Sequence, residues 1–112
     1  MIIRSAVLEG RVPEGDRAAF DAQMEGTVLQ AIATYPGIRE VRLRKPTEME
    51  AGAPAVYVQF DLYFDSLEAM HAALASSVRF QVRETIAAVM PLFEGRVYHL
   101  VMEETVFERR ER

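Results

Sequence analysis

The sequence predicts an α+β protein of the ferredoxin-like class, with a four-stranded antiparallel sheet and helices on one of its faces. Runs of β-branched and aromatic residues that alternate with period two are interrupted twice by apolar residues at three- and four-residue spacing. The resulting order, strand, helix, strand, strand, helix, strand, is the split βαβ arrangement, βαββαβ. The length of 112 residues fits one domain, over residues 1–112.

The first half of the chain supplies two strands and the first helix. Period-two alternation predicts a strand over Ile2–Gly10. Apolar residues from Phe20 to Tyr35 then recur at helical spacing, and Asp16 is the expected N-cap of this continuous helix. Pro36 ends the helix, because the residue before a proline is pushed out of the helical region. Alternation resumes over Ile38–Lys45, which predicts the second strand.

The third strand, Ala55–Phe64, alternates most strongly. One face is apolar and is made by Val56, Val58, Phe60, Leu62 and Phe64. The other face is polar and aromatic and is made by Tyr57, Gln59, Asp61 and Tyr63. Since helices can cover only one face of so small a sheet, we expect the second face to pack against a second copy of the chain.

The rest of the chain supplies the second helical region and the fourth strand. A capping residue, Asp65 or Ser66, precedes a short helix that starts near Leu67. A serine pair divides this region, and helical spacing then continues to Phe93. Arg96 to about Phe107 is expected to form the last strand, followed by a charged tail over 108–112.

Composition narrows the classes of function. The net charge of −4 provides no electrostatic footprint for nucleic acid. The chain has no cysteine, and its two histidines are far apart in sequence, so no metal-binding pattern is present and no cofactor is expected. No apolar run reaches the length of a membrane helix, and the N-terminal apolar run is too short for a signal peptide, which favours a cytoplasmic protein.

Several segments resemble a known family. The stretches Tyr63–Met70 and Ala73–Ser76, the Tyr35–Ile38 junction and the terminal segment Arg96–Val101 are similar to those of the EthD-like family, named for ethyl tert-butyl ether degradation. This family belongs to the dimeric α+β barrel superfamily. The resemblance implies a homodimer whose two sheets face each other as a barrel, with a ligand held between the sheet and the helices of each subunit.

The chain departs from the superfamily at one position. Many relatives have a histidine late in the first helix, eight residues before the proline of the Pro-Gly turn, and that position is Val28 here. An imidazole can act as a base or a ligand and a valine can do neither. Any chemistry that depends on that histidine is therefore in doubt for this protein.

Three residues are candidate catalytic groups. His99 shares a strand face with Val97 and Val101, and it becomes a candidate general base if that face meets the helices. The hydroxyls of Tyr57 and Tyr63 are candidates to stabilise an enolate or phenolate oxygen. The alternative for both tyrosines is a place in the dimer interface, where tyrosine is enriched.

Four residues are candidate ligand contacts. His71 is expected either to face a pocket, as an acid–base group or haem ligand, or to lie at the boundary of the core. Arg42, with Arg4 and Arg44, could hold a carboxylate, or it could pair with acidic neighbours at a dimer rim. Phe60 and Met24 are expected to line a ligand site from the strand and the helix.

The leading hypothesis is an EthD-like protein that binds or transforms a small apolar or aromatic metabolite in a degradation pathway. As an enzyme it would be a cofactor-independent oxidoreductase or isomerase. The first alternative is a non-catalytic module that binds a ligand or a partner protein. Haem binding is a second and less favoured alternative, for which only His71 and His99 could serve as axial ligands.

Overall fold

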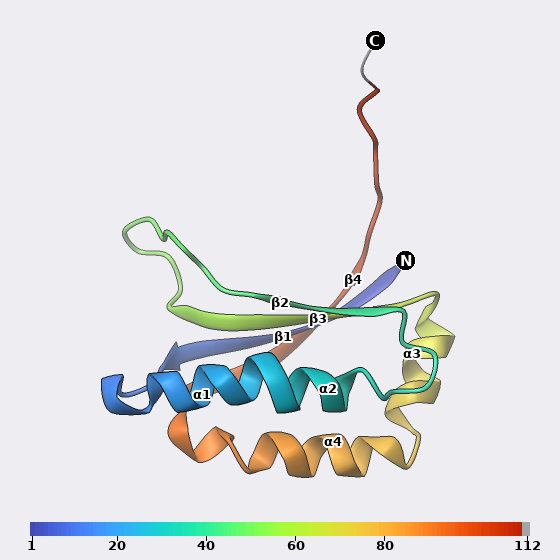
Figure 1. Ribbon diagram of the computed structural model, residues 1–112. Coiled ribbons are helices and arrows are strands. Elements are labelled where there is room, and N and C mark those ends of the chain that lie inside the picture. The colour runs from blue at the N-terminus through green and yellow to red at the C-terminus, as the bar shows by residue number, and fades with distance from the viewer. Residues whose placement is uncertain (111–112) are drawn as a thin grey trace.

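The computed structural model describes residues 1–110 and has the predicted α+β, ferredoxin-like architecture (Figure 1). The antiparallel sheet has the order β2-β3-β1-β4, with β1 at Ile2–Arg11, β2 at Glu40–Arg44, β3 at Val56–Phe64 and β4 at Glu94–Glu103. The first helical region comprises a 3₁₀ turn at Glu14–Asp16, α1 at Arg17–Gln23, a π-helical segment at Met24–Val28 and α2 at Leu29–Ile32. The second comprises α3 at Leu67–Leu74, α4 at Val78–Ala87 and a 3₁₀ turn at Met90–Leu92.

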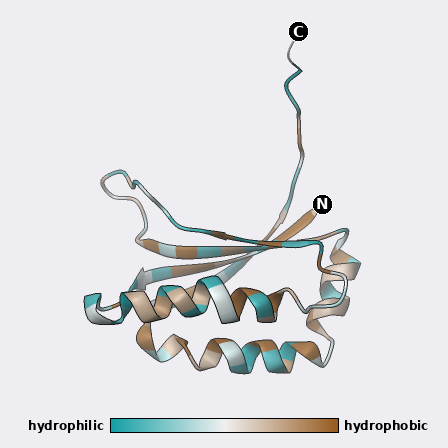
Figure 2. Ribbon diagram, in the orientation of Figure 1, coloured by the Kyte–Doolittle hydropathy of each residue, from teal (hydrophilic) through white to brown (hydrophobic). Residues whose placement is uncertain are grey.

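The helices lie on one side of the sheet, and the other side, here called the open face, has no helix over it (Figure 1). Phe20 of α1 and Phe64 of β3 are completely buried between these layers. Hydropathy colouring shows apolar residues along both the helices and the strands that face them (Figure 2). Burial of each large apolar side chain in this layer contributes about 1.5–3 kcal/mol to folding.

Two of the differences at the ends of predicted elements have a visible cause. The last strand stops at Glu103 and not near Phe107, because Glu103 pairs with Ile2, the first residue of β1, and the next bond, from the Glu104 amide, goes to the carbonyl of Met1. The side chain of Asp16 makes no capping hydrogen bond, since a 3₁₀ turn precedes α1 there. At α3, Ser66 is the cap and accepts a hydrogen bond from the Ala69 amide. The charged tail predicted over 108–112 is described as far as residue 110.

The first helix is continuous in space but contains a wide π turn, which the sequence pattern did not predict. Met24 and Val28, at the two ends of this turn, are both buried toward the sheet. Such π turns are frequent at functional sites. Within residues 1–110, no helix is both long enough and apolar enough to cross a lipid bilayer.

A β-bulge in β3 changes the predicted face of Tyr57. Leu8 pairs with Val58 and the next residue, Glu9, pairs with Val56, so Tyr57 is the extra residue on its strand. Its ring packs on the helix side, with its centroid 5.5 Å from that of Phe20. The prediction that Tyr57 shares a face with Gln59, Asp61 and Tyr63 is therefore wrong, because the bulge interrupts the alternation.

The register between β1 and β4 is fixed by a pair of glycines. Gly10 lies directly opposite Gly95, and both have positive φ angles. A Cβ atom on Gly95 would lie 2.1 Å from the carbonyl oxygen of Glu9, so the two backbones can approach this closely only without side chains. This register places Ala6 of β1 opposite His99 of β4.

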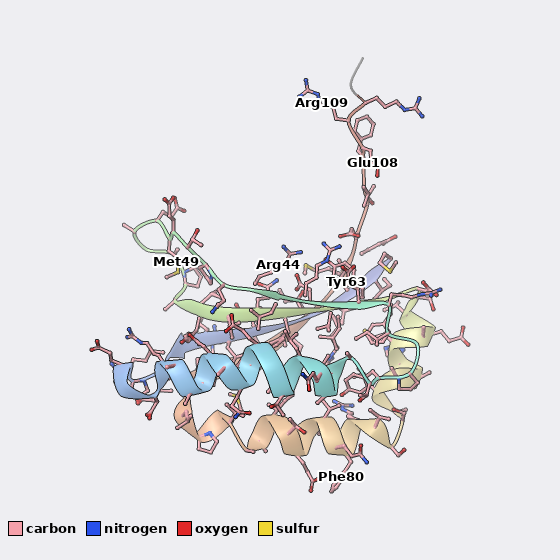
Figure 3. The ribbon with its side chains drawn as sticks, viewed as in Figure 1. Arg44, Met49, Tyr63, Phe80, Glu108 and Arg109 are labelled. Carbon is pink, nitrogen blue, oxygen red and sulfur yellow. The ribbon has the colours of Figure 1, made fainter. Side chains whose placement is uncertain are left out.

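A buried carboxylate organises the open face. Asp61 accepts hydrogen bonds from the Ser5 hydroxyl at 2.5 Å, from Gln59 Nε2 at 2.9 Å and from Arg44 Nε at 2.6 Å. Burial raises the pKa of Asp61, but these hydrogen bonds and the Arg44 charge outweigh burial and hold the pKa below its ordinary value. Arg44 and Tyr63 project from the open face, away from the helices (Figure 3).

Candidate functional site: a cavity between sheet and helices

A cavity of about 440 Å³ lies between the sheet and the helices. The strands contribute residues whose side chains point to the helix side, namely Arg4, Ala6, Leu8, Phe60, Leu62, Val97 and His99. The helical layer contributes Met24, Val28, Ile32, Tyr35, Leu74, Arg79, Val82, Arg83, Ile86, Ala87 and Met90. Most of this lining is apolar, which is typical of small-molecule sites that use a few polar groups to orient a ligand.

One end of the cavity is entirely apolar. Leu8 and Val97 pair across β1 and β4 at this end, and Met90 follows the C-terminal end of α4. Met24 and Val28 of the π turn continue this wall. Val28 is only 1% exposed and gives the cavity a hydrocarbon surface at that point.

The other end carries positive charge. Arg4 of β1, with Arg79 and Arg83 from successive turns of α4, forms what we call the cationic end of the cavity. Burial lowers the pKa of Arg4, and the positive charges of Arg79 and Arg83 lower it further. No ion pair within residues 1–110 involves any of these three arginines.

Tyr35 lies beside the cationic end and is 7% exposed. Burial raises the pKa of its phenol above the ordinary value, although the charges of Arg4, Arg79 and Arg83 oppose this shift. The phenol is therefore neutral at physiological pH and can donate a hydrogen bond into the cavity.

His99 lies at the edge of the cavity on β4, where the residue is exposed to solvent on one side. Partial burial lowers the pKa of its imidazole below 6.5, and the charges of Arg4 and Arg79 lower it further. The ring is therefore neutral near pH 7 and can accept a proton. Within residues 1–110, no side-chain hydrogen bond fixes the orientation of this ring.

The structure brings four of the residues named from the sequence together, Arg4 and three others, and separates the rest. His99, Phe60 and Met24 all line the cavity, as the sequence predicted for a ligand site between strand and helix. His71 is exposed on α3 and does not line it, so the pocket-facing interpretation of His71 is wrong. His71 lies on the solvent-facing side of α3, so its imidazole is in water.

Tyr63 and Arg42 lie on the open face, across the sheet from the cavity. The guanidinium of Arg42 stacks over the Tyr63 ring at 4.8 Å and pairs with Glu40 at 3.0 Å. The alternative prediction for Arg42, an acidic neighbour as partner, is thus the arrangement observed. Tyr57 is also outside the cavity lining, and its hydroxyl donates to Asp21 at 2.7 Å. Burial, followed by this hydrogen bond, raises the pKa of Tyr57 to about 12.

Sequence reasoning missed Tyr35, Arg79 and Arg83 as site residues. Tyr35 was assigned only to the apolar stripe of the first helix. Arg79 and Arg83 are four residues apart and border the buried Val82, so helical spacing alone places both on one edge of the inward face. Helical spacing therefore places both arginines beside the core, but arginines at the border of a buried helix face are common and do not by themselves indicate a site.

The residues of the cavity can also be compared with the ligands that a haem or a metal ion requires. His99 lines the cavity and His71 does not, so His71 is not placed to be an axial haem ligand there. Among residues 1–110, no group of three or more histidine, aspartate, glutamate or cysteine side chains is arranged to hold a metal ion.

Comparison with known proteins relates this fold to solved structures. No family model and no curated protein matches the sequence. An ethyl tert-butyl ether degradation (EthD) family protein of Bacillus halodurans superposes with a TM-score of 0.73 at 20% identity, over 94% of this chain and 100% of that one.

Two further solved structures are similar over nearly the whole chain. A dimeric ferredoxin-like protein of unknown function from Jannaschia sp. gives a TM-score of 0.61 at 16% identity, covering 93% of this chain and 100% of its own. An antibiotic biosynthesis monooxygenase gives 0.61 at 8% identity, covering 95% and 100%. The likeness shows that this chain has the ferredoxin-like fold of these proteins, which include a member of the EthD family that its sequence resembles.

Proposed function

We propose that this protein binds a small, largely apolar organic molecule in the cavity between its sheet and its helices. The observation that carries the proposal is the cavity itself, about 440 Å³ in volume, with apolar walls and polar groups gathered at one side. At about 30 Å³ per atom, the liquid volume of one water molecule, it holds roughly fifteen non-hydrogen atoms.

His99 gives the cavity a possible chemistry. A neutral imidazole at its edge can remove a proton from a carbon acid, and the electron pair left behind moves onto an adjacent carbonyl oxygen. The Tyr35 hydroxyl and the cationic end would stabilise that enolate. Return of the proton to another carbon gives an isomerase, and transfer of electrons to dioxygen gives a cofactor-independent oxidoreductase. In this scheme Tyr35 takes the role that the sequence suggested for Tyr57 or Tyr63.

Binding without turnover is the second candidate function. It is favoured by the lack of a side-chain hydrogen bond that orients His99 and by the hydrocarbon surface of Val28 where relatives have an imidazole. Both candidates require the same occupied cavity. They differ in whether His99→Gln abolishes a reaction or leaves all measurable function intact.

We also propose that two copies of the chain pair through their open faces. Leu100 and Met102 are 48% and 40% exposed there, beside the buried Asp61 network. The chain beyond β4 extends on the same side as the open face (Figure 1), and its Phe107 is 94% exposed. A second sheet over this face would cover these apolar groups. One similar solved structure is described as a dimeric ferredoxin-like protein, which supports pairing of two copies.

Filling the cavity should abolish binding of a neutral apolar probe. Ala87 and the adjacent Ala88 are both exposed at the C-terminal end of α4, but only Ala87 lines the cavity. We expect N-phenylnaphthylamine to gain fluorescence with the wild-type protein and with Ala88→Phe, and to bind at least about tenfold more weakly to Ala87→Phe. Equal binding to all three proteins would place the probe elsewhere and contradict the proposal.

The pKa of His99 should depend on Arg4. NMR titration of the imidazole ring protons should give His99 a pKa below 6.5, and Arg4→Met should raise it, with Arg109→Met in the exposed tail as the control. Because the folded protein resists protonation, the unfolded chain takes up this proton first as the pH falls. Acidification below about 6.5 should therefore lower the free energy of unfolding. If the pKa of His99 is the same in Arg4→Met as in the wild type, the charge of Arg4 does not act on His99, and the prediction is contradicted.

Dimerisation should depend on the open face. Leu100 pairs with Ser5 on the edge strand β4, and its side chain is on the open face, so Leu100→Glu would bury an unpaired charge in the proposed interface. We expect sedimentation equilibrium to show a dimer for the wild type and a monomer for this variant. Phe80→Glu is the control, because Phe80 is 69% exposed and points away from the sheet (Figure 3). A wild-type monomer, or dissociation by both variants, would argue against this interface.

A further inference from the structure

The cationic end of the cavity has charge without a counter-charge. Among the described residues, the cavity lining contains three arginines and no aspartate or glutamate. Other arginines of the chain do have partners, such as Arg44 with Asp61 at 2.6 Å and Arg96 with Glu9 at 2.8 Å. The lack of an acidic neighbour is therefore local to the cavity.

This arrangement is unfavourable for the empty protein. Arg4 and Arg79 are half-buried, and their charges repel each other and that of Arg83. Arg79 is the second residue of α4, where the helix dipole is positive and a cation is least favoured. No acidic residue occupies the first turn of α4 to offset it. Stability alone gives no reason to gather these charges here.

The groups at this end are hydrogen-bond donors. Arg79 Nη1 donates weakly to the carbonyl of Leu74 at 3.4 Å, at the end of α3, and both residues line the cavity. The Arg4 and Arg83 guanidinium groups and the Tyr35 hydroxyl add further donors around the same space. A planar anion with two oxygens matches guanidinium geometry best.

The opposite wall selects the rest of the ligand. Leu8, Met24, Met90 and Val97 offer no charged group at the far end. A ligand that fills the cavity therefore has one anionic end and one hydrocarbon end.

We infer that the ligand is an organic carboxylate with an apolar body, held through its carboxylate by Arg4 and Arg79, with Arg83 and Tyr35 beside them. This inference rests on the proposed function, since it names the class of molecule that the cavity binds. The observation that carries it is the juxtaposition of an apolar cavity wall with three arginines that form no ion pair among the described residues.

The test is displacement of N-phenylnaphthylamine by two ligands that differ only in their head group, decanoate and decanol, at a pH where decanoate is ionised. We expect decanoate to displace the probe from the wild type at a concentration at least about tenfold lower than decanol. Arg4→Gln and Arg79→Gln, made separately, should each weaken decanoate about ten- to a hundredfold and leave decanol unchanged. Arg109→Gln removes the same charge from the tail and should change neither.

The outcomes separate the two claims. Equal displacement by decanoate and decanol, or decanoate binding that survives both arginine substitutions, would overturn the carboxylate inference and leave cavity binding intact. Failure of the probe itself to bind the wild type would overturn the proposed function. Unchanged decanol displacement in Arg4→Gln and Arg79→Gln shows that each variant has kept its cavity, so a loss confined to decanoate supports the inference.

Discussion

The alternation of side chains along β1, β3 and β4 is the constraint on which the rest of this structure depends. Successive residues of β1 point to opposite sides of the sheet, so Arg4 and Ala6 face the helices and Ser5 between them faces the open side. The cavity and the open face are therefore built from interleaved residues of the same strands. A shift of one residue in register would exchange the two surfaces.

The two surfaces differ in how their charged groups are compensated. On the open face, a buried carboxylate is compensated by Ser5, Gln59 and Arg44, which lets polar groups lie in the middle of a sheet. On the helix side, the short side chains of Ala6 and Ala87 leave space, and three arginines border that space with no acidic partner among the described residues. Compensated charge is what a packed interface requires, and uncompensated charge beside an open space is what a binding site for an anion requires.

Much of the fold could be predicted from sequence, because the periodicity of apolar residues is a local signal. The element order, the break between α3 and α4 and the inward faces of Phe60 and Met24 follow from it. For His99 alternation gives only the shared face with Val97 and Val101, and not which side of the sheet the helices cover. The bulge at Tyr57 could not be predicted, since it depends on the register with β1. The cationic end also escaped prediction. The sequence groups Arg4 with Arg42 and Arg44, which lie on the open face, and only the packing of α4 on the sheet brings Arg4 together with Arg79.

The central claim is that one face of the sheet binds a small molecule and the other does not. Intermolecular nuclear Overhauser effects between N-phenylnaphthylamine and methyl-labelled protein test it most directly. The account predicts contacts to the methyl groups of Ala6, Val28 and Val97, and none to Val7 or Leu100, which alternate with the cavity residues along β1 and β4. Contacts to Val7 and Leu100 in place of Ala6 and Val97 would contradict the account, because they would place the ligand on the open face.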